Sequence, residues 1–150
     1  MISPNLTAFL AMIGFSEGTI RVKGSDNGYN VIVGGTLFHN YSNHPHQLIH
    51  INLNLASTAA GRYQLLAKYY DYYRKFLGLH DFSPASQDAI AIQQIKECKA
   101  LPDIEAGRFD TAVEKCAHIW ASLPHANYGQ HENSIESLRL AYTKSGGVIA

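Results

Sequence analysis

The sequence has no excess of charge of either sign. Twelve lysine and arginine residues balance twelve aspartate and glutamate residues, so the formal net charge is zero with histidine neutral. Nucleic-acid-binding domains usually carry a basic surface, and this composition gives no sign of one. We therefore expect no nucleic-acid partner.

Long hydrophobic runs are also absent. The longest, at 6–15, is too short to cross a bilayer, and the basic residues that open a signal peptide do not precede it. We expect a protein made in the cytoplasm without a signal peptide, whose export needs another protein.

Cysteine is scarce, and the usual catalytic and metal-binding signatures are missing. Cys98 and Cys116 do not form a CxxC motif. They are either a structural disulfide, if the protein works outside the cytosol, or two buried free thiols. There is no GxSxG, GxGxxG or phosphate loop. Four histidines crowd into 39–50, but they lack the spacing of a zinc signature and have no carboxylate among them, so we interpret them as surface residues and expect no metal or other cofactor.

The length and the residue pattern fit one domain over residues 1–150, of the α+β class. Ser3-Pro4 is typical of a helix start, and an apolar stripe at i, i+3, i+4 and i+7 follows it up to a stop near Gly18. Glycine-rich 18–54 predicts a small antiparallel sheet, with a strand at 29–33, a tight turn at Gly34-Gly35 and a strand at 36–38.

The chain is expected to be helical from Thr58 onward. The first of these helices should bury one face and end at Gly78. That face is formed by Leu65, Tyr69, Tyr72 and Phe76. A second helix should begin at Ser83-Pro84 with Ala89, Ile92 and Ile95 on one side, and shorter helices are opened by Pro102, Asp110 and Ser134 before Gly146-Gly147 ends the last.

Glu17 continues the apolar stripe of the first helix, four residues after Ile13. One interpretation is an ordinary solvated glutamate near a helix end. The other is a buried acid, because apolar neighbours and the negative end of the helix dipole both disfavour the ionised carboxyl and raise its pKa. A rise from about 4.3 to about 6, worth around 2.3 kcal/mol, suits a general acid acting on a glycosidic oxygen.

The stretch 57–64 is a second candidate site. Small residues at a helix start leave backbone N–H groups open to a ligand, and the polar and aromatic residues after them add hydrogen-bonding and stacking groups. The side chains concerned are Ser57, Thr58, Gly61, Arg62, Tyr63 and Gln64. A plain helix start with a well-packed tyrosine explains the same pattern, and the residues alone leave both interpretations open.

Several runs of the chain together resemble the phage lambda endolysin family. The matching runs are FSEGT at 15–19, GYNVIVGG at 28–35, STAAGRYQLL at 57–66, IWASLP at 119–124 and YGQ at 128–130. They are long, unusual in composition and in the same order from about residue 8 to about residue 147. The loop after Glu17 is shorter than in the lambda protein, and Cys98 stands where we would not expect a cysteine.

The resemblance implies a lysozyme-like fold and a lytic transglycosylase. Such an enzyme cleaves the bond between N-acetylmuramic acid and N-acetylglucosamine in peptidoglycan and leaves a 1,6-anhydro-muramic acid end. It implies Glu17 as the catalytic residue and Tyr63 and Gln64 in the glycan groove, with Tyr29, Tyr128 and Gln130 as further groove residues. It also implies a monomer that a holin-type membrane protein releases to the periplasm of a Gram-negative host.

Two alternatives remain open. In a hydrolytic lysozyme Asp26, nine residues after Glu17, would be the second carboxylate, although the threonine that hydrolytic phage lysozymes carry downstream is replaced by Ile32. In a non-catalytic cell-wall binding module the groove would remain without chemistry, but such a module has no use for a costly carboxylic acid at Glu17.

Overall fold

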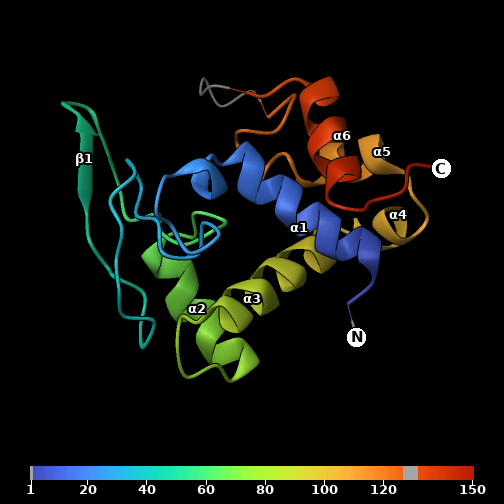
Figure 1. Cartoon of the computed structure of the whole chain (residues 1–150). Helices are drawn as coiled ribbons and strands as arrows, with labels where there is room; N and C mark the ends of the chain where they lie inside the picture. The colour runs from blue at the N-terminus through green and yellow to red at the C-terminus, as the bar shows by residue number, and fades with distance from the viewer. Residues whose placement is uncertain (1, 127–131) are drawn as a thin grey trace. The chain divides into compact units, whose positions relative to one another are not determined.

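The computed structural model describes residues 2–126 and 132–150, and these residues form six α-helices and one two-stranded antiparallel sheet (Figure 1). The chain divides into two compact units, residues 1–17 with 92–150 and residues 18–91. Helix α3 (Pro84–Glu97) begins in the second unit and ends in the first. The predicted α+β class, mainly helical with a small antiparallel sheet, is confirmed.

The first unit is built on α1 (Pro4–Ser16), which packs against α4 (Leu101–Glu105) and α6 (Ile135–Lys144). The predicted start of α1 is confirmed, because the Ser3 hydroxyl accepts a hydrogen bond from the Leu6 amide at 3.1 Å. This helix is buried on more than the one predicted face. Its buried residues are Leu6, Ala8, Phe9, Leu10, Met12, Ile13, Gly14 and Ser16.

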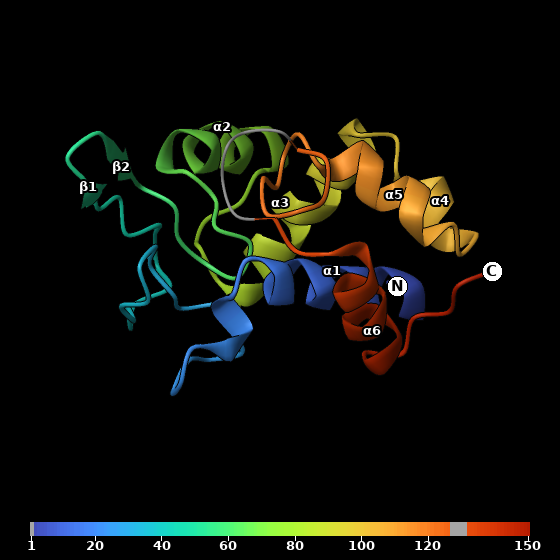
Figure 2. The ribbon, with the colours of Figure 1, turned by 90° about the horizontal axis from the view of Figure 1, so that it is seen from above.

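An aromatic cluster closes this unit. Phe9 meets Phe109 edge-on with ring centroids 6.0 Å apart, and the ring centroids of Tyr142 and Phe109 are 4.6 Å apart. Phe109 opens α5 (Phe109–Cys116), which lies beside α4 (Figure 2). The predicted starts near Pro102, Asp110 and Ser134 are confirmed, and the Ser134 hydroxyl caps α6.

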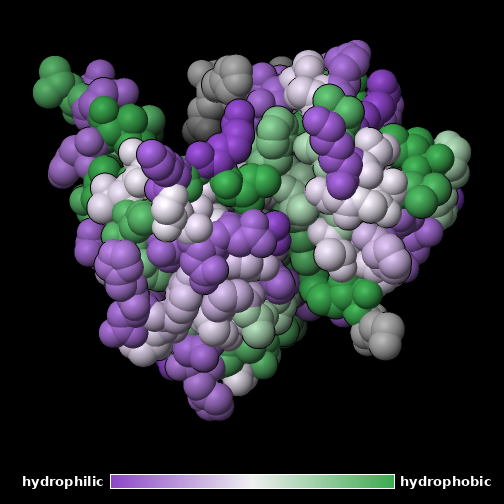
Figure 3. Space-filling model, viewed as in Figure 1, coloured by the Kyte–Doolittle hydropathy of each residue, from purple (hydrophilic) through white to green (hydrophobic). Residues whose placement is uncertain are grey.

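The second unit holds the 3₁₀ turn η1 (Thr19–Arg21), strands β1 (Ile49–Asn52) and β2 (Leu55–Ser57), and helix α2 (Ala67–Leu77). The strands form a hairpin that pairs Ile49 with Ser57 and His50 with Ala56. Apolar side chains are exposed along it, as the green atoms of the hairpin at the upper left of Figure 3 show. They belong to Ile51, Leu53 and Leu55.

The predicted strands at 29–33 and 36–38 are replaced by single bridges. Val31 bridges Leu37 around the expected Gly34-Gly35 turn, whereas Ile32 bridges Ala60 on its other side. The hydrogen bonds of this segment are therefore divided between two partners, and neither pairing extends into a ladder. The predicted turn is confirmed, and both of its glycines have positive φ.

The expected helix from Thr58 is wrong, because α2 begins only at Ala67. Gly61 and Gln64 have left-handed backbone, with φ of 86° and 54°, which no α-helix contains. The segment closes instead through a bridge between Ala60 and Leu65. Thr58 still serves the helix, since its hydroxyl accepts the Ala67 amide at 2.9 Å.

The predicted buried face of α2 is also wrong in its main members. Tyr72 and Phe76 are each 58% exposed, and Tyr69 is exposed as well. Tyr70 and Tyr73 are buried instead and form a core cluster to which partly buried Leu65 adds. The buried members of this cluster are Ile32, Phe38, Ala60, Tyr70, Tyr73, Phe82 and Ile90. The predicted stop at Gly78 is confirmed; in α3, Ile95 is buried and Ala89 and Ile92 are partly buried.

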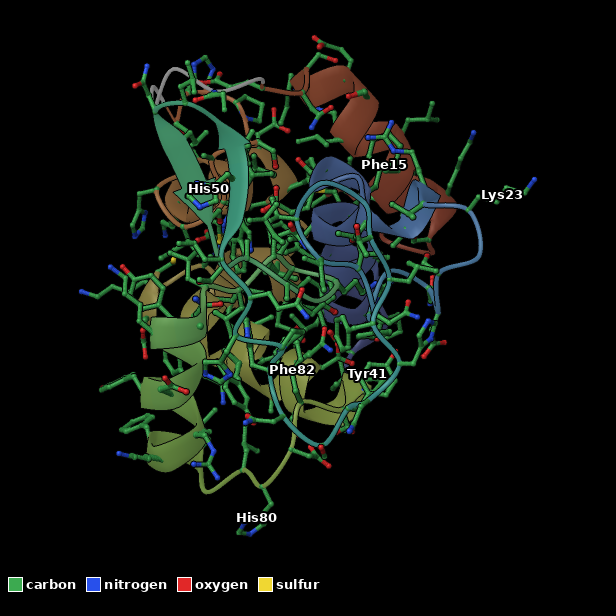
Figure 4. All side chains as sticks on the ribbon, turned by 90° about the vertical axis from the view of Figure 1, so that its left-hand side faces the viewer. Phe15, Lys23, Tyr41, His50, His80 and Phe82 are labelled. Atoms are coloured by element: carbon green, nitrogen blue, oxygen red, sulfur yellow. The ribbon has the colours of Figure 1, made fainter. Side chains whose placement is uncertain are left out.

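His44 corrects the interpretation of the histidines as surface residues. It is 2% exposed, its ring lies 4.8 Å from that of Phe82, and its Nε2 is 2.8 Å from the Leu65 carbonyl oxygen. Figure 4 shows Phe82 inside this unit and His50 out on the hairpin. His39, His46 and His50 are exposed, as predicted.

Within residues 2–126 and 132–150, no helix is both long and apolar enough to cross a membrane.

Candidate active site

Glu17 stands where α1 ends. Its amide donates to the Ile13 carbonyl at 2.8 Å, so it is the C-cap of the helix, and Gly18 follows with a φ of 81°. The carboxyl therefore lies near the negative end of the helix dipole, which disfavours its ionised form. Burial raises its pKa from 4.5 to about 7, although a hydrogen bond from the Ser122 side chain acts in the opposite direction. The sequence predicted this rise, and it leaves a glutamic acid that is about half protonated at neutral pH.

Within the first unit, one polar side chain contacts this carboxyl, and two further polar side chains are hydrogen-bonded in series behind it. The Ser122 hydroxyl reaches Glu17 and lies 2.8 Å from the Ser16 hydroxyl oxygen. The Asn133 side-chain amide donates to the Ser16 hydroxyl and to the Ser16 carbonyl, each at 3.0 Å. Ser122 and Asn133 lie more than 100 positions from Glu17 along the chain, and neither was predicted from the sequence.

In the second unit, Tyr29 and Tyr63 come together on Asp88. Both tyrosine hydroxyls donate to the same oxygen of Asp88, Tyr63 at 2.6 Å and Tyr29 at 2.9 Å. Arg62 donates to both hydroxyls, at 3.1 and 3.3 Å, and its guanidinium lies 5.0 Å from the Tyr29 ring centre. Burial and the nearby Asp88 raise the pKa of Tyr63 well above its ordinary value, so its hydroxyl keeps the proton that it donates.

Arg62 and Tyr63 point into the unit rather than outward. Arg62 is 8% exposed and Tyr63 is 5% exposed, whereas Tyr29 is only partly buried. A side-chain oxygen of Gln87 accepts the Arg62 amide at 2.9 Å and would lie 2.5 Å from a Cβ added to Gly61. Gly61 is thus required both by its left-handed backbone and by this close approach.

The other predicted side chains of this stretch are partly exposed. The Ser57 hydroxyl accepts the Ala59 amide at 3.1 Å. The Gln64 amide donates to the carbonyls of Val31 and Gly61, at 3.1 and 3.0 Å. Gln64, Ser57 and Thr58 keep some accessible surface, so they remain available to a ligand in a way that Tyr63 is not.

Asp26, the expected second carboxylate of a hydrolase, is exposed. One of its side-chain oxygens accepts the Tyr41 hydroxyl at 2.7 Å, and burial together with this bond raises the pKa of Tyr41. Tyr128 and Gln130 lie outside the described residues.

The two cysteines are free thiols, with Cys116 buried and Cys98 partly buried. Their side chains are nevertheless in contact, and Cys98 Sγ lies 3.9 Å from His118 Nε2. Nowhere in the described part of the chain do three or more histidine, cysteine, aspartate or glutamate side chains gather as a metal site would need.

The fold places the protein in the lysozyme-like class. It matches a solved structure of bacteriophage lambda lysozyme complexed with a chitohexasaccharide, with a TM-score of 0.98 and 52% identity over 100% of this chain and 99% of the other. A second structure of the lysozyme from bacteriophage lambda matches with a TM-score of 0.93 and 51% identity, with the same coverage of both chains.

Sequence comparison gives the family. The family model Endolysin matches residues 7–149. The chain is 54% identical to the endolysin of Escherichia phage lambda, over 95% of this chain and 91% of that one. It is 46% identical to the endolysin of Escherichia phage P2, over 97% and 95%. The protein belongs to the endolysin family.

Proposed function

We propose that this protein is a phage endolysin with lytic transglycosylase activity. It would cleave the β-1,4 bond between N-acetylmuramic acid and N-acetylglucosamine in peptidoglycan and cause lysis of the host cell. The observation that carries the proposal is the glutamic acid at the end of α1, whose pKa burial raises to about 7. At such a pKa one group can give a proton in one step and take a proton in the next.

In the first step Glu17 donates its proton to the glycosidic oxygen of the leaving sugar as the bond to C1 of the muramic acid breaks. In the second step the Glu17 carboxylate removes the proton of the muramic acid C6 hydroxyl, whose oxygen attacks C1 of the same ring. The nucleophile is intramolecular, so it has an effective concentration that water lacks. The products are a 1,6-anhydro end and a free 4-hydroxyl, and Glu17 is again protonated.

The glycan strand would contact the partly exposed residues of the second unit. These are Tyr29, Ser57, Thr58 and Gln64. Arg62 and Tyr63 would instead hold Tyr29 in place through Asp88, and Gly61 would let the loop pass close to Gln87. Tyr128 and Gln130 complete the proposed set. The chitohexasaccharide bound to the lambda lysozyme supports a glycan ligand of this kind.

The competing activity is hydrolysis, in which water attacks C1 with help from a second carboxylate. Asp26 is the residue for that role, and its exposed carboxylate is held by Tyr41. We favour the transglycosylase because it needs only Glu17. A non-catalytic wall-binding module is disfavoured by the same buried acid.

Mass spectrometry of fragments released from purified peptidoglycan decides between these activities. An anhydro end is one water lighter than a reducing end, so a transglycosylase releases only the lighter species. We expect Asp26→Asn to leave the rate and the product unchanged and Glu17→Gln to abolish release. Reducing ends that disappear in Asp26→Asn would establish the hydrolase, and undiminished release by Glu17→Gln would exclude the proposed role of Glu17.

The cellular setting is part of the proposal. The two endolysin relatives of this protein come from Escherichia phages, which supports action in the periplasm on the wall of a Gram-negative host. We propose a monomer whose release depends on a holin-type membrane protein. The family match runs through both compact units, which supports treating residues 1–150 as one catalytic domain.

A further inference from the structure

The hydrogen bonds behind Glu17 have a direction that the atoms themselves determine. A hydroxyl group has one proton to donate. The Ser122 side chain is hydrogen-bonded to the Glu17 carboxyl, and an ionised carboxylate can only accept, so in that state the Ser122 hydroxyl is the donor. Its oxygen must then act as the acceptor in the 2.8 Å contact with the Ser16 hydroxyl.

The same argument applies to the Ser16 hydroxyl. Its proton goes to Ser122, so its oxygen accepts, and the Asn133 amide supplies the donor at 3.0 Å. Asn133 is itself held by the Ser16 carbonyl at 3.0 Å and by its own backbone amide, which donates to the Ser122 carbonyl at 2.8 Å. Each donor therefore points towards Glu17, from an amide that cannot reverse its role.

We propose that Asn133, Ser16 and Ser122 form a one-way donor chain that positions Glu17 for both of its steps. The inference rests on the proposed function, because it concerns the acid and base roles given to Glu17 there. These three are positioning residues, since they act through Glu17 and not on the sugar.

The donor chain has two consequences for the Glu17 carboxyl. The oxygen that accepts from Ser122 is occupied by a donor, so the acid proton resides on the other oxygen, which is left for the glycosidic oxygen of the substrate. After that proton has been transferred, the donor chain stabilises the carboxylate in a buried setting where nothing else described does so. Burial raises the pKa of Glu17, and the donor chain limits that rise.

The test is the titration of Glu17 itself, observed by ¹³C NMR on protein with labelled glutamate side chains. The Glu17 signal is identified by its absence from Glu17→Gln. In Ser122→Ala we expect the pKa of Glu17 to rise by about 1 or more, because a hydrogen bond to a charged group is lost. Ser16→Ala, which removes only the second donor, should raise it less.

Matched variants separate this effect from a general disturbance. Ser122→Thr keeps the hydroxyl and should keep the titration near that of the wild type. Ser137→Ala removes a hydroxyl that donates to the Ser134 carbonyl in the same unit, and it should leave the Glu17 signal unchanged. If Ser122→Ala misfolds, the Ser16→Ala and Asn133→Asp variants carry the test, and Asn133→Asp should raise the Glu17 pKa because a carboxylate replaces the donor.

Kinetics supply the second readout. In Ser122→Ala we expect kcat to fall about tenfold with KM unchanged, and the alkaline limb of the pH profile to move to higher pH. A Glu17 pKa that stays the same or falls in Ser122→Ala would overturn the proposal. This outcome is distinct from failure of the proposed function, because the titration needs no substrate, and the product analysis does not depend on the donor chain.

Discussion

Replacing Glu17 with glutamine should stabilise the protein at neutral pH and not at acidic pH. The folded protein holds the Glu17 proton up to a pKa of about 7, whereas the unfolded chain releases it near 4.5. Between these values the folded state binds more protons, so the free energy of unfolding falls as the pH rises. At about 1.4 kcal/mol per pH unit, the loss over this window is about 3 kcal/mol.

The assay is urea denaturation of the wild type and Glu17→Gln at half-unit intervals from pH 4 to pH 8. The difference in free energy of unfolding between the two proteins cancels the other titrating groups. It should increase in favour of the variant by about 3 kcal/mol from pH 4.5 to pH 7 and then remain level. Glu114→Gln, at an exposed glutamate of α5, controls for the loss of a negative charge.

A difference that does not vary with pH would refute the reasoning, because it would mean that burial imposes no cost on the Glu17 carboxylate. The acid role proposed for the residue would then lose its physical basis. If Glu17→Gln becomes more stable than the wild type as the pH rises, and also loses all activity, the buried acid is kept at a cost to stability for the sake of its chemistry.

Three further outcomes follow from the second unit and the cysteine pair. Gly61→Ala should cost about 3 kcal/mol in urea denaturation, because its backbone is left-handed and the new methyl group would lie 2.5 Å from a side-chain oxygen; Gly34→Ala, equally left-handed but with open space around it, should cost only about 1 kcal/mol. Burial lowers the pKa of His44, so the stability lost as the pH falls below about 6.5 should be absent in His44→Gln; an unchanged pH profile would contradict this. Oxidised glutathione should join Cys98 to Cys116 and stabilise the protein by about 3 kcal/mol, and two thiols still titratable in denaturant after treatment would show that it does not.

What the sequence revealed was local. A capping serine, a proline in the first turn and a repeated apolar spacing predict helix α1. Glu17 lies four residues after Ile13, so the same spacing places it on the apolar face. The rise in its pKa then follows from two local features, the apolar face of the helix that Glu17 continues and the helix end at which it lies. Nothing distant is needed for that inference.

The errors arose where distant segments decide the outcome. Five aromatic residues within eight positions of α2 give that helix two aromatic sides, and packing against residues distant in the sequence, Phe82 among them, places Tyr70 and Tyr73 in the core. The left-handed Gln64 is invisible in a sequence, so 58–66 resembled a helix start. Asp88 gathers Tyr29 and Tyr63 from two other segments, and no spacing rule predicts that meeting.

The burial of α1 has a consequence for how the enzyme is inactivated by heat. Glu17 is the cap of a helix whose residues are buried on most sides, so its backbone cannot fray without opening the core of its unit. We therefore expect loss of activity on heating to coincide with cooperative unfolding rather than to precede it. The amide of Glu17 should exchange its hydrogen with solvent as slowly as the core amides do, which makes the proposed catalytic residue a reporter of global opening.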